Sequence, residues 1–181
     1  MIGNDVIDLV LAKTESNWQR KGFLDKLFTI TEQLQILNSQ NPEIMVWNLW
    51  SRKEAAYKIY NRQTQISAFI PLLLECFDLK EKDGSIFGKV VCCNNVYFTK
   101  TVITSHSIET IAVTQTSDFD NIKYLNPKET IFKSNGIPNY YDIETKVLQP
   151  LSKSHHGRFQ KLIALNKTVE QSYQIGLIVT Y

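Results

Sequence analysis

"WSRKEAAYK", residues 50–58, places a glutamate and a lysine one helical turn apart among aromatic residues. Glu54 and Lys58 share one helical face, yet apolar residues occupy two sides of this helix. Such a helix is normally buried between layers, where charges need partners such as a metal or a phosphate. On an exposed face the same pair is a routine ion pair, and this helix alone leaves both interpretations open. The apolar residues are Trp47, Trp50 and Tyr57 on the side of Glu54, and Met45, Leu49, Ala56 and Ile59 opposite.

Start signals around this stretch predict a long helix and several shorter elements before it. Asn41 followed by Pro42 combines a cap with a proline at the first helical position. Thr29 and Glu32 have the spacing of a capping box. The expected elements are a strand over residues 4–11, a helix over 16–28 with Ser16 as N-cap, a helix from Thr29 through Leu37, and the long helix from Pro42 to about Arg62.

After residue 66 the pattern changes to short runs of β-branched and aromatic residues. Four strands are expected, over residues 72–80, 85–93, 95–104 and 108–115, with turns at Asp83-Gly84 and Asn94-Asn95. A meander that follows helices indicates an α+β fold, with an antiparallel sheet packed against the long helix.

A more polar stretch, residues 117–135, is the expected boundary between a core and a C-terminal segment. The predicted division is residues 1–116 and residues 117–181. In the second part we expect a turn at Asn135-Gly136, a loop over 150–159, and strands over 161–166 and 174–181.

Composition restricts the class of protein. The chain has 181 residues, 43% hydrophobic and 21% charged, which is ordinary for a folded globular protein. Its net charge of +2 provides no basic field of the kind that nucleic-acid binding needs. The first residues lack a signal-peptide pattern and no stretch is long enough to span a membrane. We therefore expect a cytoplasmic protein that binds neither nucleic acid nor membrane, with Cys76, Cys92 and Cys93 as reduced thiols.

Two further stretches carry groups suited to phosphate chemistry. In GNDVID, Asp5 follows a glycine and Asp8 lies three residues further on, in an otherwise apolar strand. Asp5 and Glu54 come from separate elements and suit Mg²⁺, which prefers one or two protein oxygens and leaves positions for substrate phosphates. The stretch SKSHHGRF, residues 152–159, concentrates hydroxyls, imidazoles and cations beside a glycine. Taken alone, Asp5 is better explained as a turn or helix cap, and SKSHHGRF in isolation is explained equally simply as a solvated polar loop.

In order along the chain, GND at 3–5, FLDKLFTITEQ at 23–33, WSRKEAAYK, NGIP at 135–138 and SKSHHGRF resemble the motifs of the 4′-phosphopantetheinyl transferase superfamily. The holo-acyl-carrier-protein synthase branch looks especially similar. The resemblance implies an enzyme that takes coenzyme A (CoA) and Mg²⁺. It would transfer the phosphopantetheine arm to a serine of an apo acyl or peptidyl carrier protein and release adenosine 3′,5′-bisphosphate.

The resemblance also implies roles for individual residues. Glu54 and Lys58 would be catalytic, and Asp5, Glu54 and Asp8 would hold the metal. Ser154 and His155 would match the SxSH element that contacts the CoA phosphates, although Ser105-His106 is an alternative match. The remaining expected contacts are Lys58 and Arg158 with CoA, and Lys13, Arg20, Lys21 and Lys26 with the carrier protein.

Three features depart from the family pattern. Leu49 replaces an arginine frequent in the synthase branch, the segment after Lys58 lacks the usual glycines, and a long interval separates Lys58 from Gly136. A non-catalytic CoA- or carrier-binding relative is therefore a second hypothesis, and a Mg²⁺-dependent phosphodiesterase is a third. The resemblance leaves a homo-oligomer and a monomer both open, and no role is predicted for Arg52 or Lys53.

Overall fold

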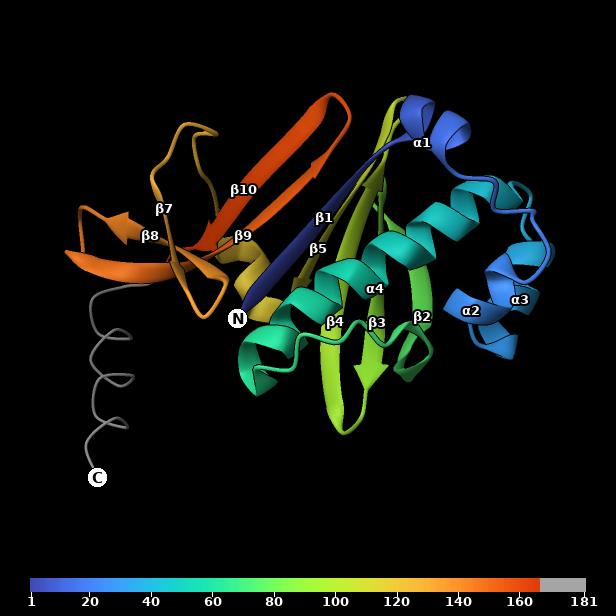
Figure 1. Ribbon diagram of the computed structural model, residues 1–181, viewed down its shortest axis with the longest axis horizontal. Coiled ribbons are helices and arrows are strands. Elements are labelled where there is room, and N and C mark those ends of the chain that lie inside the picture. Colours follow the sequence, from blue (N-terminus) through green and yellow to red (C-terminus); the bar gives the residue numbers. More distant parts are fainter. Residues whose placement is uncertain (167–181) are drawn as a thin grey trace.

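The computed structural model describes residues 1–166, which form two antiparallel sheets, a long helix that crosses one of them, and three short helices grouped at one end (Figure 1). The first sheet has the order β1-β5-β4-β3-β2. Its strands are β1 (Ile2–Asp8), β2 (Leu74–Lys82), β3 (Ser85–Cys92), β4 (Asn95–Ile103) and β5 (Ser107–Val113). The helices are α1 (Leu9–Glu15), α2 (Phe23–Leu27), α3 (Ile30–Leu37) and α4 (Pro42–Thr64), with short 3₁₀ turns η1 (Pro71–Leu73) and η2 (Thr116–Asn121).

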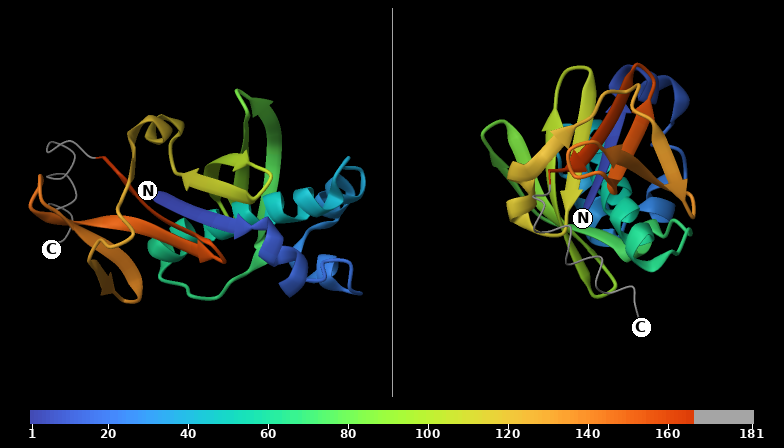
Figure 2. Two further views of the ribbon diagram at one scale, coloured as in Figure 1. Left: turned by 90° about the horizontal axis from the view of Figure 1, so that it is seen from above. Right: turned by 90° about the vertical axis from the view of Figure 1, so that its left-hand side faces the viewer.

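The second sheet has the order β6-β10-β9-β8-β7 and lies at the opposite end of the molecule from α2 and α3 (Figure 2). Its strands are β6 (Ile122–Tyr124), β7 (Ile131–Ser134), β8 (Ile137–Asp142), β9 (Val147–His156) and β10 (Phe159–Leu165). This sheet has a small core of its own around Tyr140, Leu151 and Leu162.

Helix α4 packs across one face of the first sheet and forms the main core with it. Val46, Leu49 and Ile59 of the helix are fully buried in one cluster with Val90 and Tyr97 of the sheet. The expected α+β class, with an antiparallel sheet packed against a long helix, is confirmed.

Strand β1 is buried on both of its faces. Gly3 faces α4 so closely that a Cβ there would lie 2.0 Å from the carbonyl oxygen of Ala55, so only glycine fits. Ile2 faces the other way and clusters with Ile163 and Leu165 of β10. Figure 1 shows β1, the edge strand of the first sheet, running between β5 and the β9–β10 hairpin. The strand therefore joins the long helix to the C-terminal sheet.

Several predicted elements are confirmed. Helix α3 begins after Thr29, whose hydroxyl and Glu32 form the expected capping box. Helix α4 begins at Pro42 after its Asn41 cap and ends at Thr64, two residues beyond the expected end. The four meander strands are present, as are the turns at Asp83-Gly84 and Asn135-Gly136. The expected strand at 161–166 corresponds to β10, while the one at 174–181 lies outside the described residues.

Four predictions were wrong in detail. The strand expected over residues 4–11 ends at Asp8, because the Asp8 carboxylate caps a helix that begins at Leu9. Ser16 ends that helix instead of starting one, and α2 begins only after Gly22, which has φ 77°. The loop expected over 150–159 is the β9–β10 hairpin. The turn expected at Asn94-Asn95 lies one residue earlier, since Cys92 pairs with Asn95.

Two cations of α4 that had no predicted role are fully buried. Lys53 pairs with the buried Glu32 at 2.6 Å and also donates to the carbonyl oxygens of Leu27 and Pro71, both at 2.8 Å. Arg52 donates to Asn48, to Thr99 and to the carbonyl oxygen of Ile86. These bonds hold α3 and the sheet against α4, and they compensate for the loss of hydration.

We expect Lys53→Met to lower the free energy of unfolding by about 3–5 kcal/mol, because it leaves the buried Glu32 carboxylate without its counter-ion. Urea denaturation followed by circular dichroism would measure this loss. Lys89→Met is a matched control, since it removes an ion pair with Asp78 that is exposed on both sides, and it should cost less than about 1 kcal/mol. Equal losses in the two variants would contradict the role given to the buried pair.

Candidate active site

The close approach of β1 to α4 brings Asp5 beside Glu54 and Lys58. Asp5 lies on the same face of β1 as Gly3, and its side chain is only 15% exposed. Lys58 lies one turn beyond Glu54, and its Nζ is 3.7 Å from Asp5 Oδ1. The Lys58 ammonium also donates to the carbonyl oxygen of Asn4. Residues far apart in the sequence thus form the predicted carboxylate–lysine group.

Both carboxylates are costly to ionise, chiefly because they are buried. Burial raises the pKa of Glu54 from about 4.5 to about 7; the charge of Asp5 adds to this increase and Lys58 opposes it. Burial also raises the pKa of Asp5, again opposed by Lys58. Two partly desolvated carboxylates against one ammonium form a site that a divalent cation would stabilise.

Asp5 and Glu54 fit a hard divalent cation by their chemistry. Within residues 1–166 no cluster of three or more His, Cys, Asp or Glu side chains is suited to hold a metal. A cation here would therefore receive two carboxylates at most from this part of the chain. Mg²⁺ commonly binds in this way, with water and substrate phosphates filling its other positions.

Asp8 and Arg158 are bound to each other. The Arg158 guanidinium donates to both Asp8 oxygens at 2.8 Å, and the Arg158 backbone N–H donates at 3.1 Å. Asp8 also accepts from the first amides of α1. These bonds, chiefly those from Arg158, hold the pKa of Asp8 well below its usual range. Both side chains fix the β9–β10 hairpin to α1, and their expected roles as metal and CoA ligands stay predictions.

The SxSH-like stretch on β9 presents its side chains to both faces of the strand. Ser154 is buried and accepts a hydrogen bond from the Asn4 side chain at 2.9 Å. His155 is exposed, and His156 Nδ1 accepts the backbone N–H of Asp8 at 2.8 Å. Ser154 therefore contacts β1 and, in this structure, does not open to solvent.

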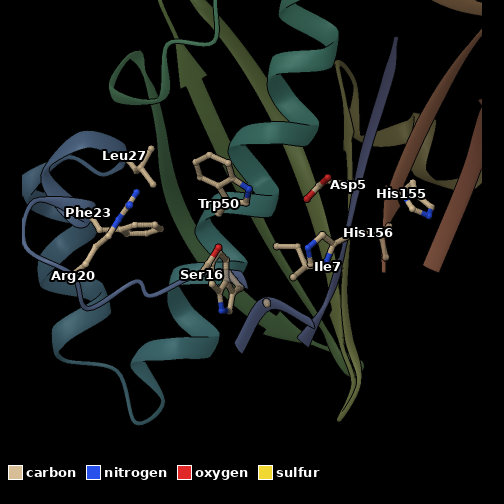
Figure 3. Close-up of a pocket in the computed structure, with 12 residues that line it drawn as sticks. Asp5, Ile7, Ser16, Arg20, Phe23, Leu27, Trp50, His155 and His156 are labelled. Carbon is tan, nitrogen blue, oxygen red and sulfur yellow. The ribbon is translucent and has the colours of Figure 1, made fainter. Parts of the chain in front are cut away.

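A largely apolar cavity of about 390 Å³ opens beside Asp5 (Figure 3). Arg20 lines it from the segment before α2, Trp47 and Trp50 line it from α4, and Asp5 faces it from β1. Trp47 Nε1 is buried and has no hydrogen-bond partner among the described residues. The cavity therefore offers a largely apolar wall beside the Asp5 carboxylate. Its other lining residues are Val6, Ile7, Ala12, Ser16, Phe23, Leu27, His155 and His156.

A smaller pocket of about 140 Å³ lies on the other side of Lys58, between α4 and the second sheet. Lys58, Arg62 and Lys153 line it, and its lining includes no acidic residue. Arg62 donates to the carbonyl oxygens of Pro138 and Leu151, so its charge has only neutral partners here. The predicted GxP element, residues 136–138, lies at this pocket. The pocket is suited to an anion.

Comparison with known sequences agrees with this arrangement. The sequence model of the 4′-phosphopantetheinyl transferase superfamily matches residues 1–121, two thirds of the chain. The chain belongs to this superfamily. A search of curated protein sequences finds no match.

The superfamily match includes Asp5, Glu54 and Lys58, together with Ser105-His106, and it ends before Ser154. His106 lies exposed in the β4–β5 turn, and its carbonyl oxygen accepts the backbone N–H of Leu9. Phosphopantetheinyl transferases thus share with this chain the segment that carries Ser105-His106. The second sheet lies beyond the matched residues.

The predicted carrier-docking cations are exposed around α1 and α2. Lys13 is in the last turn of α1 and Lys26 in α2, while Arg20 and Lys21 lie between these helices. The guanidinium of Arg20 also lies over the ring of Phe23, 5.5 Å from its centre. No helix within residues 1–166 is long and apolar enough to cross a membrane.

Sequence reasoning missed Asn4 and Arg62 as parts of this region, and it named Lys153 in SKSHHGRF without bringing it beside Lys58 and Arg62. The signal for Asn4 was present, because an amide stands beside Asp5 in a strand that is otherwise built for burial. Arg62 and Lys153 are 91 residues apart (153 − 62) in the sequence, and only the packing of the second sheet on α4 brings them together.

Glu54→Gln should stabilise the metal-free protein at alkaline pH. A pKa raised in the folded state means that the folded protein binds this proton more tightly than the unfolded chain. The stabilisation that comes from this tighter proton binding is thus complete below about pH 4.5, and it is lost as the pH rises through about 7. We expect the melting temperature of Glu54→Gln to exceed that of the wild type by roughly 5 °C at pH 8, with little difference at pH 4.5.

Differential scanning fluorimetry at both pH values would measure this difference. Glu81→Gln, which removes an exposed carboxylate from β2, is the control and should shift neither melting temperature. A Glu54→Gln variant that is less stable than the wild type at pH 8 would contradict the burial of that charge.

Proposed function

We propose that the protein transfers the 4′-phosphopantetheine arm of CoA to a serine of an apo acyl or peptidyl carrier protein, as a transferase of the holo-acyl-carrier-protein synthase type. The observation that carries the proposal is the group formed by Asp5, Glu54 and Lys58. All three lie within the matched segment, and β1 and α4 bring them together. Membership of the superfamily supports phosphopantetheine transfer in general, and the carrier, the Mg²⁺ requirement and the subtype are parts of this proposal.

The reaction is a phosphoryl transfer. The serine oxygen of the carrier attacks the pyrophosphate phosphorus that bears the pantetheine arm. The bond from this phosphorus to the bridging oxygen breaks, and adenosine 3′,5′-bisphosphate leaves. Such reactions depend on positioning and charge neutralisation more than on covalent chemistry. A local cluster of charged residues can supply both, even though the net charge of the whole chain is only +2.

Glu54 acts on the attacking serine oxygen, and Lys58 acts on the leaving phosphate. Glu54 would accept the serine proton, directly or through one water. Lys58 neutralises the charge that builds on the leaving phosphate and can protonate it. Asp5 and Glu54 would together hold Mg²⁺, which when bound supplies Lewis-acid stabilisation of the pyrophosphate.

The two pockets suit the two substrates. The cationic pocket of Lys58, Arg62 and Lys153 is proposed to hold phosphate groups of the CoA nucleotide, because phosphates bind where cations meet no competing carboxylate. The apolar cavity joins Arg20 to Asp5 and offers the acceptor serine a route from the α1–α2 surface. Carrier proteins are usually acidic around that serine. Lys13, Arg20, Lys21 and Lys26 would therefore contact the carrier.

Incubation with CoA, Mg²⁺ and a panel of apo-carrier proteins tests the proposal. We expect mass spectrometry to show the phosphopantetheine mass on the serine of at least one carrier. Glu54→Gln should reduce kcat by about 10²–10³-fold, because it removes a proton acceptor and a charge together. Glu81→Gln is the matched control and should transfer as fast as the wild type.

Absence of transfer to every carrier would reject the enzyme and favour a non-catalytic binding protein. Transfer by Glu54→Gln at the wild-type rate would reject the mechanism while leaving the activity in place.

A further inference from the structure

Asn4 is a fully buried amide one residue before Asp5. Alternation along β1 directs Asp5 toward α4 and the Asn4 side chain toward β9. A buried amide in this position is costly unless its polar atoms are bonded, whereas an apolar residue would pack between the layers at no such cost. The identity of this residue therefore requires a reason.

Every polar group of Asn4 named here has a partner outside its own strand. Oδ1 accepts the hydroxyl of Ser152 at 2.7 Å, and Nδ2 donates to Ser154 Oγ at 2.9 Å and to the carbonyl oxygen of Lys161 at 3.4 Å. The backbone N–H donates to Ser152 Oγ at 2.9 Å. Two serines of β9 thus hold both the side chain and the backbone of one residue of β1.

The remaining backbone group of Asn4 reaches the active site. Its carbonyl oxygen accepts a hydrogen bond from Lys58 Nζ, which also lies 3.7 Å from Asp5 Oδ1. Hydrogen bonds are directional, so the two serines fix the orientation of the peptide that receives the ammonium. Neither serine makes a hydrogen bond to Lys58 or Asp5 among those found here, although Ser152 lines the same pocket as Lys58.

We propose that Asn4, clamped by Ser152 and Ser154, is a positioning residue that holds the Lys58 ammonium beside Asp5. The consequence for catalysis rests on the proposed function, whereas the coupling between β9 and Lys58 does not. The second sheet then contributes to the reaction through β1. Ser154 acts on Lys58 from a buried position, in place of the direct phosphate contact expected from its SxSH-like sequence.

Steady-state kinetics of Ser154→Ala separates these two roles. Loss of positioning should lower kcat about tenfold and change the KM for CoA by less than about twofold, because ground-state binding is retained. Ser154→Thr, which keeps the hydroxyl, should recover most of the activity. A raised KM for CoA with unchanged kcat would instead make Ser154 a phosphate contact and overturn the proposal.

Thr101→Val is the control for a structural effect. It removes a buried hydroxyl bond, between Thr101 and Thr110 at 2.8 Å, in the middle of the first sheet. Its loss of stability should resemble that of Ser154→Ala, but its kcat should stay at the wild-type value. An equal fall of kcat in both variants would mean that general destabilisation, and no positioning, explains the effect.

A thermal double-mutant cycle tests the coupling without any activity. Ser154→Ala should lower the melting temperature less in a Lys58→Met background than in the wild type, because the bond that it helps to align is already absent. Equal shifts in the two backgrounds would overturn the positioning role. If the wild type transfers nothing, the proposed function fails and this cycle still decides whether Asn4 couples the serines to Lys58.

Discussion

Burial of β1 on both faces is the constraint on which the rest of the structure depends. One face packs on α4 through Gly3, where a side chain would meet the Ala55 carbonyl, and the other packs on the β9–β10 hairpin. A strand held in this way cannot slip, because a shift of one residue would exchange its two faces. Asp5 therefore stays directed at Glu54 and Lys58. The same constraint makes the second sheet a support for the active site.

Charge burial is used in two different ways along α4. Lys53 and Arg52 are fully buried, and their several hydrogen-bond and ion-pair partners make them part of the framework. Glu54 and Asp5 have too few, since one ammonium faces two carboxylates and the pKa values of both acids are raised. Neighbouring residues of one helix thus differ in function because their partners differ. An excess of buried negative charge is what a divalent cation and a phosphate-bearing substrate can relieve together.

The sequence predicted much of the first sheet and of α4, because capping signals and the change of period are local. It also predicted that Asp5 joins Glu54 and Lys58, through motif order. It missed the β9–β10 hairpin, because the polar stretch SKSHHGRF is typical of a loop. In the structure most of this stretch belongs to β9, and its alternate residues face β1. It could not pair Asp8 with Arg158, or Asn4 with two serines, since those contacts depend on how the sheets pack. Side chains that resembled ligands in the sequence are bonded to each other here.

In the proposed mechanism, Asp5 and Glu54 bind the CoA pyrophosphate together with a divalent cation. Calorimetric titration of CoA into the protein, with Mg²⁺ and then with a chelator, measures this coupling. We expect binding at least about tenfold tighter with Mg²⁺, a gain of about 1.4 kcal/mol, and loss of this preference in Asp5→Asn. Equal affinity with and without Mg²⁺ in the wild type, or a preference that survives in Asp5→Asn, would contradict it.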